Sequence, residues 1–574
     1  MRKFVSAIRF SLFVLAALAT SSSVEAKTVY QVWDVKFELR SPDGYRKPTL
    51  TVNGEYPAPI IYATQGDTIV VNVINNLETE DLAIHWHGIK QSRTPWADGT
   101  EGVSQCPILP GRNHTYQFVV DQPGTFLYHP HSGLLRSEGL QSFIIVAAAA
   151  GKSEPFVHDY EASILLEDWY HQSHLEQAAS LAAKPFRWVG EPQSLLINGI
   201  GKFNCSDANA TNAGCNDTGP ESLYSLTVVY GKTYRIRIGS LTSLSALSFE
   251  IEGHDMTVVE ADGHYVEPFV VKNLFIYSGE TYSVLVNASQ DPTRSYWMSS
   301  AVVARNRTTP IGLAILTYLN TSNSNSNSAT AKKPPMTPPE VARWDDLESR
   351  LKQSRAIVAR KDHVIEVPKT PDRVILMLNT QNNINGTKKW AMNGVSLKFP
   401  DKPYLIALKD GLLKGGVNQT QPPDSYDVRN YDIYSEPKNP NATASSSYYK
   451  LKLNSTVDVI LQNANVLTGK VSETHPWHLH GHDFWVLGYG AGKYNQSTDQ
   501  SKLNLVNPIM KYTVPLHGYG WTALRFKADN PGVWLFHCHL DAHFFMGMGV
   551  VFEEGIEQVG ELPQSIMGCI RTKH

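Results

Sequence analysis

Short runs in which hydrophobic and polar residues alternate follow one another along most of the chain. Residues 67–76 read DTIVVNVINN, 225–240 read SLTVVYGKTYRIRIGS and 458–467 read DVILQNANVL. These runs are rich in Val, Ile, Tyr and Thr, and Gly, Pro and Asn separate them, which is typical of β-strands joined by tight turns. No long stretch shows the helical period of 3.6 residues. The pattern therefore predicts an all-β protein.

The strand patterns fall into three regions. The first and third end alike, because QPGTFLYHPH (122–131) and NPGVWLFHCH (530–539) each place an aromatic strand and an H-x-H motif after a Pro-Gly turn. This internal echo predicts duplicated β-sandwiches with Greek-key connections rather than one large sheet. The Ser/Asn/Pro-rich segment TSNSNSNSATAKKPPMTPPE is typical of a linker. We expect domains at 27–150, 151–320 and 346–574, with the linker at 321–345.

The first 26 residues differ in character from the rest. Arg2, Lys3 and Arg9 precede the apolar run FSLFVLAALA, and small and polar residues follow it up to Ala26. This is typical of a secretory signal peptide with cleavage before Lys27, and the apolar run is too short to cross a bilayer. We therefore predict a signal peptide at 1–26 and a secreted, extracellular product without a membrane anchor.

Twelve N-x-[S/T] motifs agree with secretion, because such motifs accept N-linked glycans in secreted proteins. Charged residues make up 18% of the chain and the net charge is −3, with no long basic run, so we expect no binding to nucleic acid or to an anionic membrane. The twelve motifs begin at Asn113, Asn204, Asn209, Asn216, Asn287, Asn306, Asn320, Asn385, Asn418, Asn441, Asn454 and Asn495.

Five cysteines leave one thiol unpaired in an oxidising compartment. Cys205 and Cys215 lie close together in a polar segment, and we predict a local disulfide between them. We predict a second disulfide between Cys106 and Cys569, which would tie the C-terminal tail to the first domain. The remaining cysteine is Cys538, within the run WLFHCHLDAHFFMGMG.

Ten of the twenty histidines fall into four clusters, and each cluster contains an H-x-H motif. In a strand, residues i and i+2 face the same side, so each motif offers two imidazoles to one site. One such motif alone is more often a surface pair, but four beside apolar strand residues indicate a polynuclear metal site. Imidazole suits Zn, Cu, Fe and Ni. The clusters are HWHG (His85, His87), YHPHSG (His129, His131), HPWHLHG (His475, His478, His480) and HCHLDAH (His537, His539, His543).

Among the metals that imidazole binds, the residues around Cys538 indicate copper. His475, Cys538, His543 and a downstream methionine provide two imidazoles, a thiolate and a thioether, which is the ligand set of a blue-copper site. Cys538 points to one face of its strand, and His537 and His539 point to the other. The cysteine would then serve a blue site and its two neighbours the polynuclear cluster, with a short covalent path between them.

The four motifs, in this order over essentially the whole mature chain, resemble those of a multicopper oxidase, and within that family the chain resembles the ascorbate oxidases of plants. The resemblance implies three cupredoxin-like Greek-key β-sandwich domains and four copper ions: one type 1, one type 2 and a type 3 pair. The type 1 ligands would be His475, Cys538, His543 and, ten residues after the cysteine, Met548 rather than Met546. The type 2 ligands would be His85 and His478. The type 3 ligands would be His87, His129, His131, His480, His537 and His539.

The resemblance also implies a reaction. Ascorbate would give up one electron at a time at the type 1 copper, and the cluster would reduce O2 to two waters with four electrons. Trp188 in AKPFRWVGEPQS and Trp390 in GTKKWAMNGVSL would stack against the flat substrate, and His543 would accept its proton. Asp98 in WADGT and Asp541 in HCHLDAH are the candidate proton carriers.

Two alternatives stay open at this level. A laccase that oxidises phenols shares the copper ligands, whereas a non-catalytic surface protein of the same family would have lost some; this chain keeps every expected ligand. Two features depart from the plant ascorbate oxidases. Five cysteines cannot form their third disulfide, and Pro130 removes a backbone N–H within YHPHSG. The sequence does not determine the oligomeric state, for which a homodimer is one option.

Overall fold

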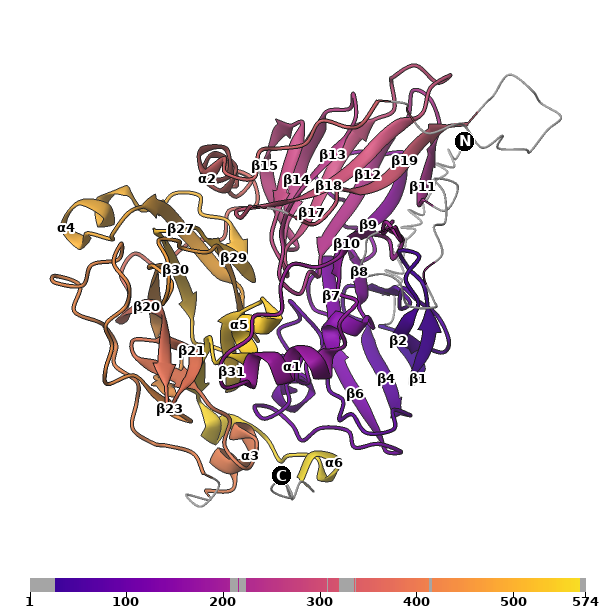
Figure 1. Ribbon diagram of the computed structural model, residues 1–574. Coiled ribbons are helices and arrows are strands. Elements are labelled where there is room, and N and C mark those ends of the chain that lie inside the picture. The colour runs from indigo at the N-terminus through magenta and orange to yellow at the C-terminus, as the bar shows by residue number, and fades with distance from the viewer. Residues whose placement is uncertain are drawn as a thin grey trace, which may run out of the picture.

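The computed structural model is built mainly of β-sheets, which form three successive pairs (Figure 1). Among the described residues, each sheet takes its strands from only one of the spans 28–147, 160–318 and 373–554. The all-β sandwich prediction is therefore confirmed, while the predicted domain limits stay a prediction. The predicted signal peptide and most of the predicted linker lie outside the described residues, which are 26–206, 215, 223–306, 308–319, 335, 337–411 and 416–567.

The first pair of sheets shows how alternating residues produce this fold. Along β4, Ile69, Val71 and Val73 are buried while their neighbours are half-buried, so one face of the strand closes on a core. Phe126 and Ile144 of the second sheet belong to the same apolar core. The sheets have the orders β2-β1-β4-β6 and β3-β8-β7-β5. Their strands are β1 (Thr28–Arg40), β2 (Lys47–Val52), β3 (Ile61–Thr64), β4 (Thr68–Asn75), β5 (Ile84–His85), β6 (Asn113–Val119), β7 (Gly124–Pro130) and β8 (Ser142–Ala147).

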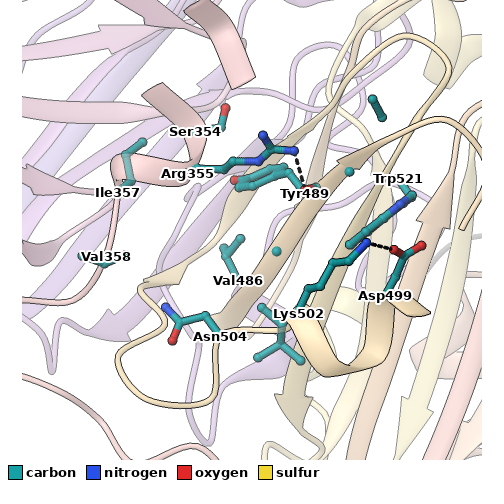
Figure 2. Close-up of a pocket in the computed structure, with 14 residues that line it drawn as sticks. Ser354, Arg355, Ile357, Val358, Val486, Tyr489, Asp499, Lys502, Asn504 and Trp521 are labelled. Carbon is teal, nitrogen blue, oxygen red and sulfur yellow. Dashed lines mark hydrogen bonds and ion pairs between the residues drawn. The ribbon is translucent and has the colours of Figure 1, made fainter. Parts of the chain in front are cut away.

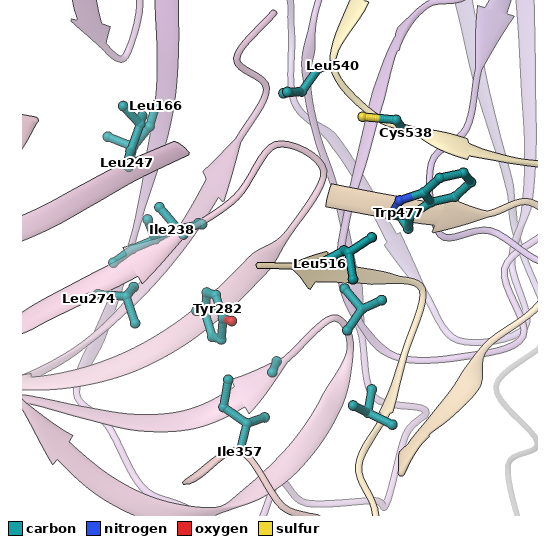
Figure 3. Close-up of a cluster of buried hydrophobic side chains, with 14 of the residues drawn as sticks. Leu166, Ile238, Leu247, Leu274, Tyr282, Ile357, Trp477, Leu516, Cys538 and Leu540 are labelled. Carbon is teal, nitrogen blue, oxygen red and sulfur yellow. The ribbon is translucent and has the colours of Figure 1, made fainter. Parts of the chain in front are cut away.

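The second pair shares its apolar core with the third. Figure 3 shows Leu166, Ile238 and Leu247 of the second pair in the same cluster as Trp477 and Cys538 of the third. The sheet orders are β10-β9-β12-β17-β14-β15 and β11-β19-β18-β13-β16. The strands are β9 (Tyr160–Trp169), β10 (Ser194–Ile197), β11 (Ser225–Val228), β12 (Thr233–Ser240), β13 (Ala246–Ile251), β14 (Met256–Ala261), β15 (His264–Val271), β16 (Asn273–Ile276), β17 (Thr281–Asn287), β18 (Tyr296–Val303) and β19 (Gly312–Tyr318).

The third pair has the orders β23-β22-β21-β20-β25-β30-β27-β28 and β24-β32-β31-β26-β29. In the smaller sheet, β26 and β31 are neighbours in the interior, and every residue of both strands is buried. The strands are β20 (Arg373–Ile384), β21 (Thr387–Met392), β22 (Val395–Leu397), β23 (Thr443–Ser445), β24 (Tyr449–Leu451), β25 (Thr456–Gln462), β26 (His475–Leu479), β27 (Phe484–Ala491), β28 (Met510–Lys511), β29 (Thr513–Leu516), β30 (Gly520–Lys527), β31 (Gly532–Cys538) and β32 (Gly549–Glu554).

The helices are short and connect or flank the sheets. The first, α1, begins with a capping box, in which Ser173 Oγ accepts the Glu176 N–H (3.3 Å) and Glu176 Oε2 accepts the Ser173 N–H (2.9 Å). Glu138 of the first region accepts the His174 N–H (2.6 Å) and so ties α1 to that region. The helices are α1 (His174–Ala182), α2 (Leu347–Ala356), α3 (Tyr404–Lys409), α4 (Gln496–Asp499), α5 (Asp541–Phe545) and α6 (Gln564–Met567), with 3-10 turns at η1 (Pro95–Ala97), η2 (Leu135–Glu138), η4 (Gln500–Lys502) and η5 (Ile556–Gln558).

Pro130 does not prevent β5 and β7 from pairing. Ile84 lies opposite Pro130 and donates its N–H to Tyr116 Oη instead (3.1 Å). On the other side of the proline, His131 donates its N–H to Ala83 O (2.8 Å). The strand pairing therefore continues past the residue that lacks a donor.

The described cysteines agree with the predicted local disulfide and the predicted unpaired thiol. Cys205 and Cys215 form the predicted disulfide, and Cys538 is a buried free thiol. Cys106 is disulfide-bonded, and its Sγ lies 3.2 Å from the carbonyl oxygen of Ile566, near the C-terminal end of the described residues. Cys569 lies outside those residues, so the Cys106–Cys569 pairing stays a prediction.

The helices also bear on the predicted lack of a membrane anchor. Within the part of the chain that the structure describes, none of them is long and apolar enough to cross a membrane.

Two glycines of β27 offer a matched test of packing in the third pair. A Cβ on Gly490 would lie 2.1–2.4 Å from the indole of Trp521, whereas a Cβ on Gly488 would meet nothing closer than 3.7 Å. We expect Gly490→Ala to destabilise the protein by about 1–3 kcal/mol through overpacking, seen as a lower melting temperature. Gly488→Ala is the control and should change the melting temperature little. Equal melting temperatures for the two variants would contradict the packing.

Candidate metal centre

Three buried ligand-type side chains meet at the junction of β26, β31 and α5. β26 begins at His475, β31 ends at Cys538, and α5 carries His543. Cys538 Sγ lies 3.7 Å from His475 Nδ1 and 3.8 Å from His543 Nδ1, and the two nitrogens are 3.1 Å apart. A thiol and two imidazoles thus converge on one point, as the blue-copper ligand pattern predicts.

The two methionines of MGMG occupy different places beside this group, although both are fully buried. The Met548 N–H donates to His543 O (3.1 Å) and the Met548 carbonyl accepts the Cys538 N–H (3.0 Å). The Met546 carbonyl instead accepts the Trp390 N–H (3.0 Å). The backbone of Met548 is therefore tied to two members of the group, which supports its selection as the axial ligand.

Eight further histidines form one cluster on the other side of β31, and all of them except the half-buried His131 are buried. They come from the ends of β5, β7, β26 and β31, so both ends of the chain contribute. Three pairs of Nε2 atoms lie 3.1–3.2 Å apart: His85 with His478, His480 with His537, and His129 with His539. The groups whose ring nitrogens converge are His85–His87–His478, His87–His129–His539 and His131–His480–His537.

Carbonyl oxygens orient most of these rings. The Nδ1 atoms of four histidines lie within hydrogen-bond distance of backbone carbonyls, which can only accept, so each Nδ1 carries the proton. Each Nε2 then points its lone pair into the cluster, as a metal ligand requires. The pairs are His85 with Asp98 O (2.8 Å), His129 with Pro130 O (2.9 Å), His478 with Tyr512 O (2.7 Å) and His537 with Cys538 O (3.0 Å).

His87 has the opposite orientation. Its Nε2–H donates to the carbonyl of Gly279 (2.8 Å), and its buried Nδ1 has no hydrogen-bond partner among the described residues. A Cβ on Gly279 would lie 2.9 Å from the His87 ring and 3.0 Å from His539 Nδ1, and its φ is +86°. Only glycine fits there. The unpaired Nδ1 fits a metal ligand.

Burial keeps the imidazoles neutral. Desolvation, together with the neighbouring His543, lowers the pKa of His475 to about 3, and desolvation lowers the pKa of His131 to about 3. Burial also lowers the pKa of six further histidines of the cluster well below the ordinary range. These are His87, His129, His478, His480, His537 and His539. Neutral imidazoles are the form that binds a metal.

Asp98 contacts the cluster directly. Its Oδ2 lies 2.9 Å from His480 Nδ1 and accepts the Thr100 hydroxyl (2.7 Å), while its backbone carbonyl holds His85. Burial alone would raise the pKa of this carboxyl, but His85 and Thr100 lower it. The carboxylate is therefore ionised and fixes the tautomer of His480.

Asp541 lies in an ion pair. Its Oδ1 is 2.5 Å from Arg136 Nη2, and the same guanidinium donates to the carbonyl of His539 (2.6 Å). Burial raises the pKa of Asp541 to about 6, against the effect of Arg136. Both predicted proton carriers thus lie beside the histidine cluster, and their role in proton transfer stays a prediction.

The two predicted substrate tryptophans flank the Cys538 group unequally. The rings of Trp188 and His543 have centroids 6.2 Å apart, and Trp188 is 42% exposed. Trp390 lies closer, 5.1 Å from His543 and 4.9 Å from His475, but it is 0% exposed. Trp188 can offer a face to a ligand, whereas Trp390 in this structure packs behind the two imidazoles.

Three models of the multicopper oxidase family match this chain, at residues 34–151, 161–321 and 418–558. The chain is 48% identical over 579 residues to an L-ascorbate oxidase of Cucumis sativus, covering 100% of this chain and 96% of the relative. The chain belongs to the multicopper oxidase family.

Other members of the family show the same whole-chain match. Laccase-22 of Oryza sativa subsp. japonica is 34% identical over 570 residues, covering 95% of each chain. The crystal structure of a laccase from Botrytis aclada superposes with a TM-score of 0.74 at 28% identity, covering 94% of this chain and 89% of that one. The chain is therefore a copper-dependent oxidoreductase that uses O2, with cupredoxin-like domains.

The donor atoms of this multicopper oxidase fit copper. A thiol between two imidazoles suits a blue-copper site, and eight imidazoles suit a polynuclear one. The Cys538 thiol has a pKa raised above its ordinary value by burial, so it is neutral until a metal displaces its proton.

Sequence reasoning missed three residues that complete these sites. Glu473 Oε2 lies 3.1 Å from His543 Nε2, Arg136 contacts His539, and Gly279 holds His87. Glu473 could have been found from its position two residues before the predicted ligand His475, although β26 begins only at His475. Arg136 and Gly279 carry no local signal, since their partners lie hundreds of residues away.

The copper sites are distinct from the hollow shown in Figure 2. That groove, of about 370 Å³, lies on the third region and is lined by Arg355, Tyr489 and Trp521, among others. Arg355 donates to Tyr489 O (3.0 Å), and Lys502 pairs with Asp499 (2.7 Å). None of the predicted site residues lines it.

Replacing the carboxylate beside His480 tests its supporting role. We expect Asp98→Asn to weaken copper retention in the histidine cluster roughly 10–100-fold, because the charge that orients His480 is lost. Copper content after dialysis against a chelator would measure this. The control is Asp499→Asn, which removes a buried carboxylate outside the sites. Equal copper retention in the two variants would show that Asp98 does not support the ligand.

Proposed function

We propose that this multicopper oxidase is an ascorbate oxidase that takes single electrons from ascorbate and reduces O2 to two waters. The observation that carries the proposal is whole-chain similarity: 48% identity to an L-ascorbate oxidase against 34% to a laccase. The exposed indole of Trp188 beside His543 supports it, because a flat reductant can stack there.

Two groups of residues would hold four copper ions. His475, Cys538, His543 and Met548 would hold the type 1 ion, and His85 and His478 the type 2 ion. Bound copper supplies the chemistry of accepting single electrons from a donor and delivering four of them to O2. The type 3 pair would be held by His87, His129, His131, His480, His537 and His539.

Peptide bonds join the two groups. Cys538 is bonded directly to His537 and His539, and these three side chains belong to the two different sites. A single peptide bond on each side of Cys538 therefore joins the proposed electron-accepting group to the proposed oxygen-reducing one. The thioether of Met548 supports an easily oxidised donor, because an axial thioether lowers the potential of a blue site compared with Leu or Phe.

The reductant would approach from the side of Trp188. His543 lies near both this exposed ring and the buried Trp390, so it is the ligand nearest a donor stacked on Trp188. Trp390 would then support His543 from behind instead of stacking on the substrate. For the protons that water formation needs, Asp98 is the first candidate because it contacts His480, and Asp541 with Arg136 is the second.

The predicted signal peptide and the twelve glycosylation motifs support a secreted, extracellular enzyme. Its partners would be a small reductant and O2. The homodimer stays an option, which the mass of the purified protein in solution would test.

Removing the thiol tests the whole proposal. We expect Cys538→Ser to lose the blue absorption band and to reduce ascorbate-dependent O2 consumption to background, because the thiolate belongs to the electron-accepting site. An oxygen electrode and an absorption spectrum measure the two effects. Strong turnover of a simple phenol by the unmodified protein, with no preference for ascorbate, would favour a laccase. Absence of a blue band in that protein would indicate a non-catalytic member of the family.

The two methionines provide a matched test of the axial position. Met548→Leu should keep the blue band and raise the reduction potential of the blue site, because a non-coordinating side chain replaces a thioether. Met546→Leu should leave the potential unchanged, since Met546 contributes packing. Redox titration of the blue band separates the two. A raised potential in Met546→Leu alone would assign the axial position to Met546.

A further inference from the structure

A strap from the second region reaches over to the third beside the Cys538 group. The strap, residues 183–191, follows α1, which in Figure 1 points toward β21 and β31. Lys184 Nζ donates to the carbonyl of Asn385 (2.8 Å) at the turn between β20 and β21. Lys388 Nζ of β21 lies 4.6 Å from the centre of the Phe186 ring, a cation–π contact. Two contacts therefore join the strap to the β20–β21 hairpin.

The same strap carries the exposed tryptophan. The rings of Phe186 and Trp188 are stacked with centroids 6.4 Å apart, and Trp188 lies 6.2 Å from His543. The contact between Lys388 and Phe186 thus lies one aromatic ring away from the surface where the reductant would stack.

Four cationic side chains gather on the strap and hairpin, and we call them the cationic rim: Lys184, Arg187, Lys388 and Lys389. Lys184 and Arg187 are exposed, and the other two are half-buried. Within the described part of the chain, none of the four forms an ion pair. By contrast, Arg305 is neutralised by Glu191 (2.8 Å). A concentration of unpaired positive charge therefore lies on a chain whose net charge is −3.

One acidic group opposes the rim. Glu473 lies 3.1 Å from His543 and is partly exposed, so an anion that approached His543 without the rim would meet a carboxylate. The approach to His543 is therefore bordered by the positive charges of the rim, and the negative charge of Glu473 lies beside the imidazole.

We propose that the cationic rim selects anionic reductants over neutral ones by steering them onto Trp188, an inference that rests on the proposed oxidase function. Clustered unpaired charge raises the rate of encounter with an oppositely charged substrate, and salt weakens the effect. Ascorbate is a planar monoanion at neutral pH, whereas a simple hydroquinone is planar and neutral. Both can stack on an indole, so charge is the property that separates them.

The test compares these two donors in the copper-loaded enzyme. We expect Lys184→Gln/Lys388→Gln to lower the ratio of kcat/KM for ascorbate to kcat/KM for hydroquinone roughly tenfold at low ionic strength. The loss should lie in KM and not in kcat, and it should shrink as salt is added. The control is Lys152→Gln/Lys369→Gln, which removes two exposed lysines outside the rim and should leave the ratio unchanged.

A charge-retaining variant separates steering from structural support. Lys184→Arg/Lys388→Arg should keep the ratio of the unmodified enzyme. Equal loss of both donors in the glutamine variant would overturn selection by charge and leave only support of Trp188. A salt-insensitive ascorbate reaction, or a glutamine variant that matches its control, would also overturn it. If the unmodified enzyme oxidises hydroquinone but not ascorbate, the proposed ascorbate oxidase function fails instead.

Discussion

The alternation of side chains along a single strand, β31, is the constraint on which both metal centres depend. Neighbouring residues of a strand face opposite sides, so Cys538 meets His475 and His543 on one side while His537 and His539 join the histidine cluster on the other. Because every residue of β31 is buried, both centres form inside the protein. A shift of one residue in the pairing of β31 with β26 would exchange the two faces and destroy both centres together.

Burial on both sides of β31 then decides how the ligands are held. A buried imidazole must remain neutral, and its single N–H must find an acceptor. Those acceptors come from all three sheet pairs: the carbonyl of Asp98 in the first, of Gly279 in the second and of Tyr512 in the third. The second region supplies no predicted copper ligand, but it fixes His87. Ligand orientation is therefore a property of the assembled molecule and not of any one sandwich.

This division explains how much the sequence could predict. The alternation of hydrophobic and polar residues predicts the all-β fold. The H-x-H motifs and the unpaired Cys538 predict the two ligand groups and their separation, because the strand period and the number of cysteines can be read from the sequence alone. The burial of Trp390, the contact of Arg136 with His539 and the glycine under His87 could not be predicted, because each depends on residues that only tertiary packing brings together. The effect of Pro130 on strand pairing could not be predicted either. It depends on Tyr116, whose hydroxyl oxygen accepts the Ile84 N–H opposite the proline.

The two tryptophans near His543 differ in exposure, and this difference bears on the choice of substrate. The third region packs the fully buried Trp390 against this imidazole, whereas the exposed ring near it, Trp188, belongs to the strap. The strap belongs to the second region, is anchored on the β20–β21 hairpin by Lys184 and presents Trp188. The residues that we propose to select the electron donor therefore lie on a different segment from the predicted copper ligands. The ligands can stay the same throughout a family whose members oxidise different donors, because a change in the strap or in the hairpin alters the entrance without disturbing β31.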